Sequence, residues 1–346
     1  MTRFFNDKMF DRLLDGGDLH PMVRALQDLP QLVFIPRGGY ATIYYKAARL
    51  FQINSDLQKR KSKHTWMFVI TKKYCDNAKL LDLDWFTKCR TDLDLGLDSK
   101  KQDKYRFNLD LSKCDYDFWY RFFVCMMCGV NMHRLQHRDA EKEIQQRIMT
   151  ENNTASIKEP TDYLVLDMEY QQPGDRSYGR FDMVALRWPG HMRKNPDYQP
   201  ELALIEVKHG SGALAGASGM QDHLNKIDCF CPDNEFYDGL DKMLNQMHQL
   251  GLIKLHSKIK KTIQVNRDPA KKQFIFALGN CSQKSHELHN IVKQMQEPKN
   301  YQLRFVTSSF IGYGLYEDGM MTLPQFRDLL AVYDSATDCG NQSQGV

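Results

Sequence analysis

The most constraining feature of this sequence is the stretch ELALIEVKHGSGAL at residues 201–214. Its first half is apolar at consecutive positions, which is typical of a β-strand that is covered on both faces. Because side chains alternate along a strand, Glu206 and Lys208 continue the row of Leu202 and Leu204. The glycines that follow end the strand. We therefore expect a buried strand that carries two opposite charges on one face.

Residues 139–308 show a regular succession of patterns that predicts helix, three strands, helix, strand, helix and strand. The expected strands are DYLVLDMEYQ, YGRFDMVALRW, ELALIEVK, KQFIFALG and YQLRFVTSS. Three successive strands predict an antiparallel meander, and the later helix–strand alternation predicts strands added in parallel. We expect an α/β (α+β) fold in which a mixed sheet is flanked by helices.

The N-terminal part of the chain has an α+β pattern of its own. Helices are expected within residues 4–28, followed by strand, turn and strand in QLVFIPRGGYATIYYKAARLFQI. HTWMFVIT predicts a third strand, DFWYRFFVCMMCGVNMHRLQH predicts a buried helix, and the polar residues 90–112 predict a loop. We expect an N-terminal substrate- or partner-binding region at 1–138, a second domain at 139–335 and a flexible tail at 336–346.

Composition restricts the class of protein. A hydrophobic content of 42% and a charged content of 26% are ordinary for a soluble globular protein. The N-terminus lacks the apolar core of a secretory signal, and the longest uncharged apolar run, 122–132, is too short to span a bilayer. Nine cysteines at irregular positions predict reduced thiols. We therefore expect a cytoplasmic protein outside the membrane.

Positive charge is clustered although the net charge is only +4. One basic cluster lies at residues 59–64 and another at residues 254–272. Lys258, Lys260 and Lys261 in the second cluster are candidates to contact a phosphate backbone, because each neutralised phosphate releases counterions. An ordinary solvated surface explains the same clusters.

An aspartate, Asp182, interrupts the apolar strand GRFDMVAL. If this strand neighbours ELALIEVK, a slightly staggered pairing brings Asp182 beside Glu206. Two carboxylates that close repel each other unless a cation lies between them, and hard oxygen ligands suit Mg²⁺ or Mn²⁺. Lys208 would orient or deprotonate a water, or stabilise charge on a phosphate. These groups suit metal-assisted hydrolysis of a phosphodiester.

The segments GRFDMVAL and ELALIEVK, with their acids 24 positions apart, resemble the core of the PD-(D/E)XK nuclease superfamily. The resemblance covers roughly residues 139–308 and leaves the N-terminal region unexplained. It implies a restriction-endonuclease-like core of helix, three strands, helix and strand. It also implies Asp182, Glu206 and the carbonyl of Val207 as metal ligands, with Lys208 as the catalytic lysine. The proline that precedes the aspartate in this superfamily is replaced here by Phe181.

The resemblance suggests further site residues. Members often carry an acid on the preceding helix, and Glu143 matches it best, although a glutamate on a helix surface explains it equally well. Glu169 is an alternative metal ligand. Gln221 matches a glutamine found in one branch, but the tyrosine usual four places later is replaced by Asn225. His223 is a candidate phosphate contact, or an ordinary polar residue.

The resemblance implies a magnesium-dependent nuclease that acts on DNA more often than RNA, in restriction, repair or phage defence. The N-terminal region would bind substrate or a protein partner, or form a homo-oligomer. One alternative keeps the fold without catalysis, as a nucleic-acid-binding or scaffolding module. Another is a zinc-dependent interaction protein built on Cys125, Cys128, His133 and His137. A continuous helix through these four residues would not wrap them around one ion.

Overall fold

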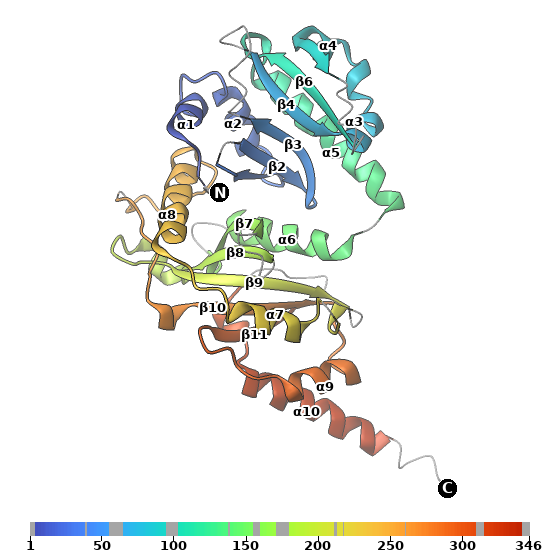
Figure 1. Cartoon of the computed structure of the whole chain (residues 1–346), viewed down its shortest axis with the longest axis vertical. Coiled ribbons are helices and arrows are strands. Elements are labelled where there is room, and N and C mark those ends of the chain that lie inside the picture. Colours follow the sequence, from blue (N-terminus) through green and yellow to red (C-terminus); the bar gives the residue numbers. More distant parts are fainter. Residues whose placement is uncertain are drawn as a thin grey trace. The chain divides into compact units, whose positions relative to one another are not determined.

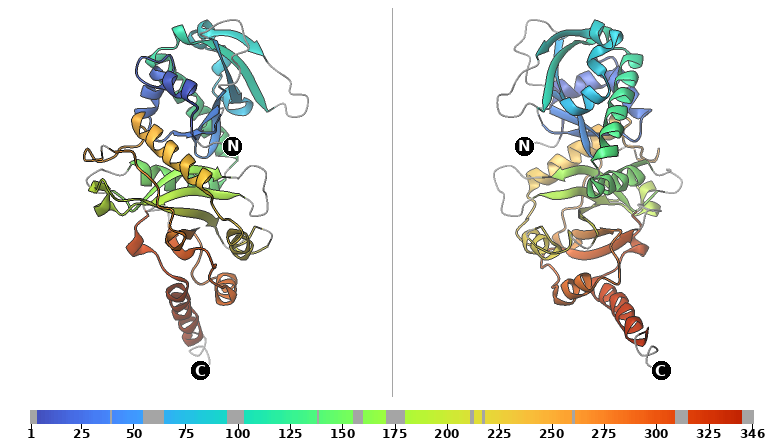
Figure 2. Two further views of the ribbon diagram at one scale, coloured as in Figure 1. Left: turned by 60° about the vertical axis from the view of Figure 1, so that its left-hand side comes forward. Right: turned by 90° about the vertical axis from the view of Figure 1, so that its right-hand side faces the viewer.

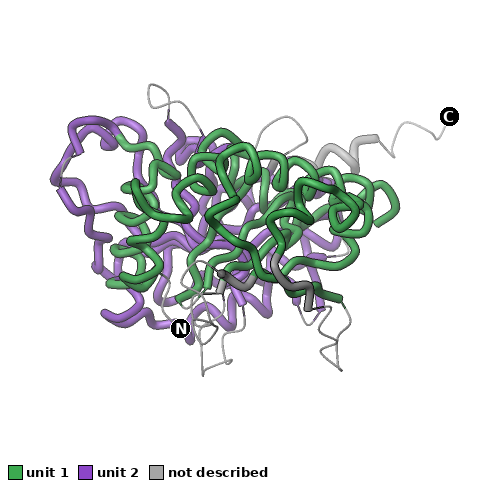
Figure 3. Tube along the Cα trace, turned by 90° about the horizontal axis from the view of Figure 1, so that it is seen from above, with its two compact units in different colours: residues 1–150, 238–255 green, residues 151–237, 256–346 purple. Residues whose placement is uncertain are grey.

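The structure is a computed structural model. It describes residues 4–38, 40–54, 65–94, 103–137, 139–154, 160–170, 180–210, 213–216, 218–259, 261–308 and 315–340. The chain divides into two compact units, which Figure 3 shows in green and purple. Unit 1 comprises residues 1–150 and 238–255, and unit 2 comprises residues 151–237 and 256–346. The division falls at 150/151, whereas the sequence pattern placed it at 138/139.

Unit 1 contains a six-stranded antiparallel sheet with the strand order β1-β2-β3-β4-β6-β5. Its strands are β1 Val33–Pro36, β2 Tyr40–Tyr45, β3 Ala48–Asn54, β4 Thr65–Thr71, β5 Arg90–Asp94 and β6 Lys104–Asp110. Its helices are α1 Asp7–Leu13, α2 His20–Gln27, α3 Lys72–Asn77, α4 Asp84–Cys89, α5 Tyr116–Gln136, most of α6 Ala140–Thr154 and most of α8 Asn234–Gln249. The expected loop at 90–112 therefore contains two strands.

Helix α5 forms the core of unit 1 together with the sheet. The carboxylate of Asp115 caps the helix by accepting a hydrogen bond from the backbone N–H of Phe118 at 2.8 Å. Phe122, from α5, packs edge-on against Phe51 of β3 at 5.0 Å between ring centroids, and Phe51 stacks on Phe68 of β4 at 4.9 Å. This aromatic packing confirms the expected buried helix.

Unit 2 contains a five-stranded mixed sheet with the strand order β11-β10-β9-β8-β7 (Figure 1). Its strands are β7 Tyr163–Tyr170, β8 Phe181–Arg187, β9 Glu201–His209, β10 Gln273–Gly279 and β11 Gln302–Ser308. Strands β7, β8 and β9 pair antiparallel, and β9, β10 and β11 pair parallel. The expected mixed α/β class, with a meander extended by parallel strands, is confirmed.

The helices of unit 2 lie after β9, after β10 and after β11 along the chain. They are α7 Met220–Ile227, the first turn of α8 Asn234–Gln249, α9 His286–Gln294 and α10 Leu323–Gly340. Helices α9 and α10 contact each other, and Phe326 of α10 stacks on Phe305 of β11 at 4.7 Å. Figure 2 shows these elements from two further directions.

The central strands of unit 2 are buried on both faces. All seven residues of β10 are buried, as are the first eight of β9 and the first six of β8. Continuous burial explains why these strands are apolar at consecutive positions rather than at alternate ones. The charged residues within them are therefore exceptions to the packing pattern.

Among the helices in the described ranges, none combines the length and the apolar character that a membrane crossing needs.

Candidate active site

Asp182 and Glu206 lie on neighbouring strands of the unit 2 sheet. The antiparallel register of β8 and β9 pairs Met183 with Ile205, and one further step along both strands brings Asp182 alongside Glu206. Lys208 lies two positions further along β9, on the same face as Glu206. All three residues are buried. The expected juxtaposition of Asp182, Glu206 and Lys208 is therefore present in the structure.

The carboxylate of Asp182 is held by the backbone of the neighbouring strand. Its Oδ2 accepts a hydrogen bond from the backbone N–H of Val207 at 2.8 Å. This bond ties Asp182 to the residue between Glu206 and Lys208. This hydrogen bond lowers the free-energy cost of burying an aspartate inside an apolar strand, because a buried carboxylate needs hydrogen-bond donors.

The two carboxylate oxygens of Glu206 have different surroundings. Oε1 lies 2.7 Å from Nζ of Lys208 and 2.9 Å from Nε2 of His223. Oε2 is buried and has no hydrogen-bond partner among the described residues. A buried oxygen without a partner costs free energy, and native proteins rarely leave one unless an ion or a water satisfies it. Oε2 of Glu206 is therefore the oxygen of this site that could accept an ion or a water.

The donor set fits a hard divalent cation with a water-rich coordination shell. Within the ranges that the structure describes, no group of three or more His, Cys, Asp or Glu side chains could hold a metal ion. Mg²⁺ is commonly bound through only one or two carboxylates and keeps several waters. Asp182 and Oε2 of Glu206, supplemented by the carbonyl of Val207, fit that mode of binding better than an all-protein cage.

The two further candidate acids, Glu169 and Glu143, belong to different units. Glu169 has a left-handed backbone with φ 53°, and the flanking pairs of β7 and β8 place it alongside Asp182. Its Oε1, however, lies 3.5 Å from Nη1 of Arg180. Glu143 is on α6, in the part of that helix that belongs to unit 1, whereas Asp182 and Glu206 belong to unit 2.

Helix α7 carries Gln221 and His223, the two residues predicted to contact substrate. Gln221 is exposed, and its Nε2 donates to Oδ1 of Asn225 on the same helix at 3.0 Å. His223 points instead to Glu206, and its side chain is 12% exposed. The structure therefore places His223 against a predicted metal ligand. No local sequence pattern indicates this contact, because the rotation of α7 relative to the sheet depends on tertiary packing.

Of the predicted basic contacts, Lys261 lies toward the other end of β9. Nζ of Lys261 pairs with Asp197 at 2.9 Å, and both side chains are largely exposed. Lys258 is exposed, and Lys260 falls outside the described residues. The nearby Asn266 donates its backbone N–H to the carbonyl of Pro200, just before β9 begins. Since a strand rises about 3.3 Å per residue, that end is on the order of 17 Å from Glu206.

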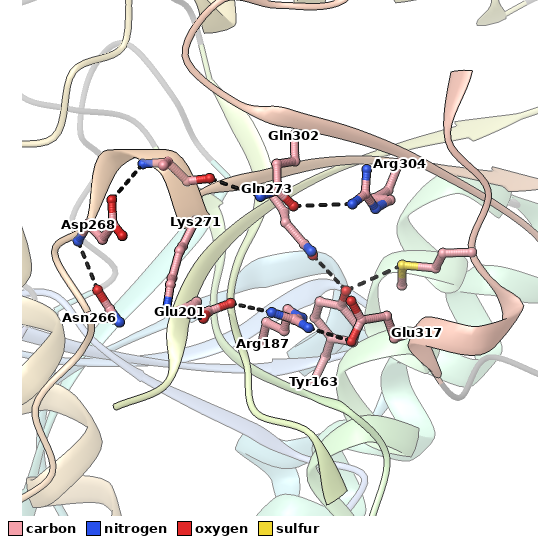
Figure 4. A network of polar contacts seen from close by, with 12 residues as sticks. Tyr163, Arg187, Glu201, Asn266, Asp268, Lys271, Gln273, Gln302, Arg304 and Glu317 are labelled. Atoms are coloured by element: carbon pink, nitrogen blue, oxygen red, sulfur yellow. Dashed lines mark hydrogen bonds and ion pairs between the residues drawn. The ribbon is translucent and has the colours of Figure 1, made fainter. Parts of the chain in front are cut away.

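Figure 4 shows the polar network at this far end of the sheet. Arg187 of β8 pairs with Glu201 at the start of β9 and, at 2.6 Å, with Glu317. Nζ of Lys271 lies 3.6 Å from Oε1 of Glu201. Oppositely charged groups meet each other here, so this network ties strands together and leaves no open carboxylate like that of Glu206.

The predicted zinc ligands lie along one helix. Cys125, Cys128 and His133 belong to the continuous helix α5, and His137 follows as its C-cap. The rings of His133 and His137 are 4.7 Å apart, but burial raises the pKa of the Cys125 thiol. A raised pKa disfavours the thiolate that zinc requires. The geometry of α5 therefore does not assemble these four side chains around one ion.

Comparisons with known proteins do not assign the site. No protein-family model, curated protein or solved structure matches the chain. We therefore interpret the site from the chemistry of Asp182, Glu206, Lys208 and His223.

Proposed function

We propose that this protein is a divalent-metal-dependent nuclease that hydrolyses phosphodiester bonds of nucleic acid. The observation that carries the proposal is the open, buried Oε2 of Glu206 beside Asp182, with a buried ammonium on the same strand. The order β7, β8, β9, α7, β10 in unit 2, preceded along the chain by α6, supports a restriction-endonuclease-like core. Both considerations point to the same pair of carboxylates.

Asp182 and Glu206 would hold Mg²⁺ or Mn²⁺ with help from the carbonyl of Val207. When bound, the ion would polarise a phosphoryl oxygen and lower the pKa of a coordinated water. The hydrogen bond from Val207 fixes Asp182, so its second oxygen keeps a defined direction. The ammonium of Lys208 fixes Oε1 of Glu206 in the same way.

Lys208 would act directly on the substrate. Its ammonium has three donors, and among the described residues one of them is engaged, by the bond to Glu206 at 2.7 Å. The other donors would orient the attacking water and stabilise negative charge on the phosphate. Because the ammonium is buried, these interactions are stronger than they would be in bulk water.

We extend the proposal to substrate and setting. The sequence resemblance favours DNA over RNA, and unit 1 would select the substrate, bind a partner or form an oligomer. The described cysteines are free, which suits a reducing compartment such as the cytoplasm. Restriction, repair and phage defence are all consistent with such an enzyme.

Incubation with plasmid, single-stranded DNA and RNA tests the proposal. Wild type should cleave in Mg²⁺ or Mn²⁺ and not in EDTA, whereas Asp182→Ala and Lys208→Ala should not cleave. Lys293→Ala, at an exposed position of α9, serves as the matched lysine control for loss of charge. Cleavage that survives both site substitutions would refute the assignment. No cleavage by any of the proteins would favour the non-catalytic binding module, and stoichiometric bound zinc would favour the zinc-dependent interaction protein.

A further inference from the structure

We infer that His223 is a positioning residue that selects which oxygen of Glu206 faces the metal, an inference that rests on the proposed function. Nε2 of His223 lies 2.9 Å from Oε1 of Glu206. A ring nitrogen that donates to a carboxylate carries a proton in the neutral tautomer and in the protonated ring alike. The role therefore requires no change of charge on the imidazole.

The argument starts from the unequal surroundings of the two oxygens. Lys208 and His223 both donate to Oε1, whereas Oε2 has no partner within the described part of the chain. A lysine ammonium is a compact charge with three rotatable donors, so on its own it imposes little direction on a carboxylate. The planar imidazole is directional, so it fixes the plane of the carboxylate. With both donors in place, Oε2 is the oxygen that remains available.

Helix α7 holds His223 in a defined place. Met220, Leu224 and Ile227 of this helix are buried, and the backbone N–H of Met220 donates to the carbonyl of Leu214 at 2.8 Å. A Cβ at Gly219 would lie 2.6 Å from that same carbonyl oxygen, so only glycine fits this N-cap. The imidazole is thus carried by a packed helix with a fixed start, not by a free loop.

Residues that orient metal ligands without touching the metal have a measurable effect. Their loss typically lowers metal affinity about 10-fold to 100-fold. We expect His223→Leu to weaken Mn²⁺ binding within that range. His223→Gln, which keeps a donor at similar reach, should restore affinity close to wild type. A purely structural role for the ring would not be rescued by an amide.

The test is calorimetric titration of the full chain with Mn²⁺, without nucleic acid. His286→Leu, an exposed histidine of α9 in the same unit, is the matched control and should bind as wild type does. Thermal unfolding establishes that each variant is folded. If His223→Leu does not fold, His223→Asn takes its place, because the asparagine side chain is too short to reach Oε1.

The outcomes separate the inference from the proposed function. Weakened binding in His223→Leu with rescue by His223→Gln supports the positioning role. Wild-type affinity in His223→Leu, or no rescue in a folded His223→Gln, overturns that role and leaves the nuclease proposal standing. Failure of wild type to bind Mn²⁺ overturns both.

Discussion

Nζ of Lys208 lies 2.7 Å from Oε1 of Glu206, and each side chain is 4% exposed. Two full charges are thus removed from water on one strand. Such a pair is costly to bury and costly to break, because removing one partner leaves the other charge uncompensated. Replacing both partners with apolar residues should recover stability without recovering function, and this separation can be measured.

The first prediction concerns the stability of that pair. Lys208→Met should destabilise the protein by about 3–5 kcal/mol, because the carboxylate of Glu206 would lose its charged partner. The double variant Lys208→Met/Glu206→Leu should be more stable than Lys208→Met alone, although it has lost both site residues. Urea unfolding of the single and double variants measures this coupling. Strictly additive losses would show that the two charges do not depend on each other.

The second prediction separates charge from hydrogen bonding at Asp182. Asp182→Ala leaves the buried N–H of Val207 without its acceptor, which should cost about 1–3 kcal/mol. Asp182→Asn retains an acceptor oxygen and should unfold close to wild type. Both variants should lose metal-dependent cleavage, since each lacks the anionic ligand. A destabilised Asp182→Asn, or one that retains activity, would contradict this reading of the carboxylate.

The third prediction concerns the polar network at the far end of β9 (Figure 4). Arg187→Met removes the guanidinium that pairs with both Glu201 and Glu317, and Glu201 is only 7% exposed. We expect the free energy of unfolding of Arg187→Met to fall by about 3–5 kcal/mol, measured by urea unfolding. Lys271→Met is the control, because this lysine is 49% exposed and its pair with Glu201 is worth less than about 1 kcal/mol. Equal losses of unfolding free energy in Arg187→Met and Lys271→Met would show that the pair made by Arg187 is worth no more than the exposed pair made by Lys271.

The fourth prediction follows from a buried thiol in unit 1. Burial raises the pKa of Cys75 from 9.0 to about 12. Above pH 9 the unfolded chain loses this proton while the folded chain keeps it, so stability falls as pH rises from about 9 toward 12. The slope from one such thiol is at most about 1.4 kcal/mol per pH unit.

Urea unfolding between pH 8 and pH 11 tests the thiol prediction. Cys75→Ala should show a shallower decline than wild type, and Cys128→Ala, at an exposed position of α5, should keep the wild-type slope. If stability declines with pH at the same slope in wild type and in Cys75→Ala, the loss of stability at alkaline pH comes from other groups.

The unit 2 sheet was predictable because its strands are covered on both faces and are therefore apolar throughout. Asp182 and Glu206 were conspicuous for the same reason, since charges inside such strands have few structural explanations. The contact of His223 with Glu206 was not predictable. It depends on how α7 packs against the sheet, and no local sequence pattern predicts that packing.

Unit 1 was harder to predict from sequence. Strands β5 and β6 lie in a polar stretch that has the composition of a loop, and they form because β6 pairs with β4 and β5 pairs with β6. The turn between β2 and β3 was missed as well. It uses Lys46 and Ala47 at φ 48° and 50°, where glycine, asparagine or aspartate would ordinarily mark a turn.

The central claim is that Asp182 and Glu206 share one divalent ion. Anomalous diffraction from crystals soaked in Mn²⁺ tests it most directly. We predict one strong peak within coordination distance of a carboxylate oxygen of Asp182 and of Oε2, not Oε1, of Glu206. A peak elsewhere, or none at these two carboxylates at saturating Mn²⁺, would contradict the account.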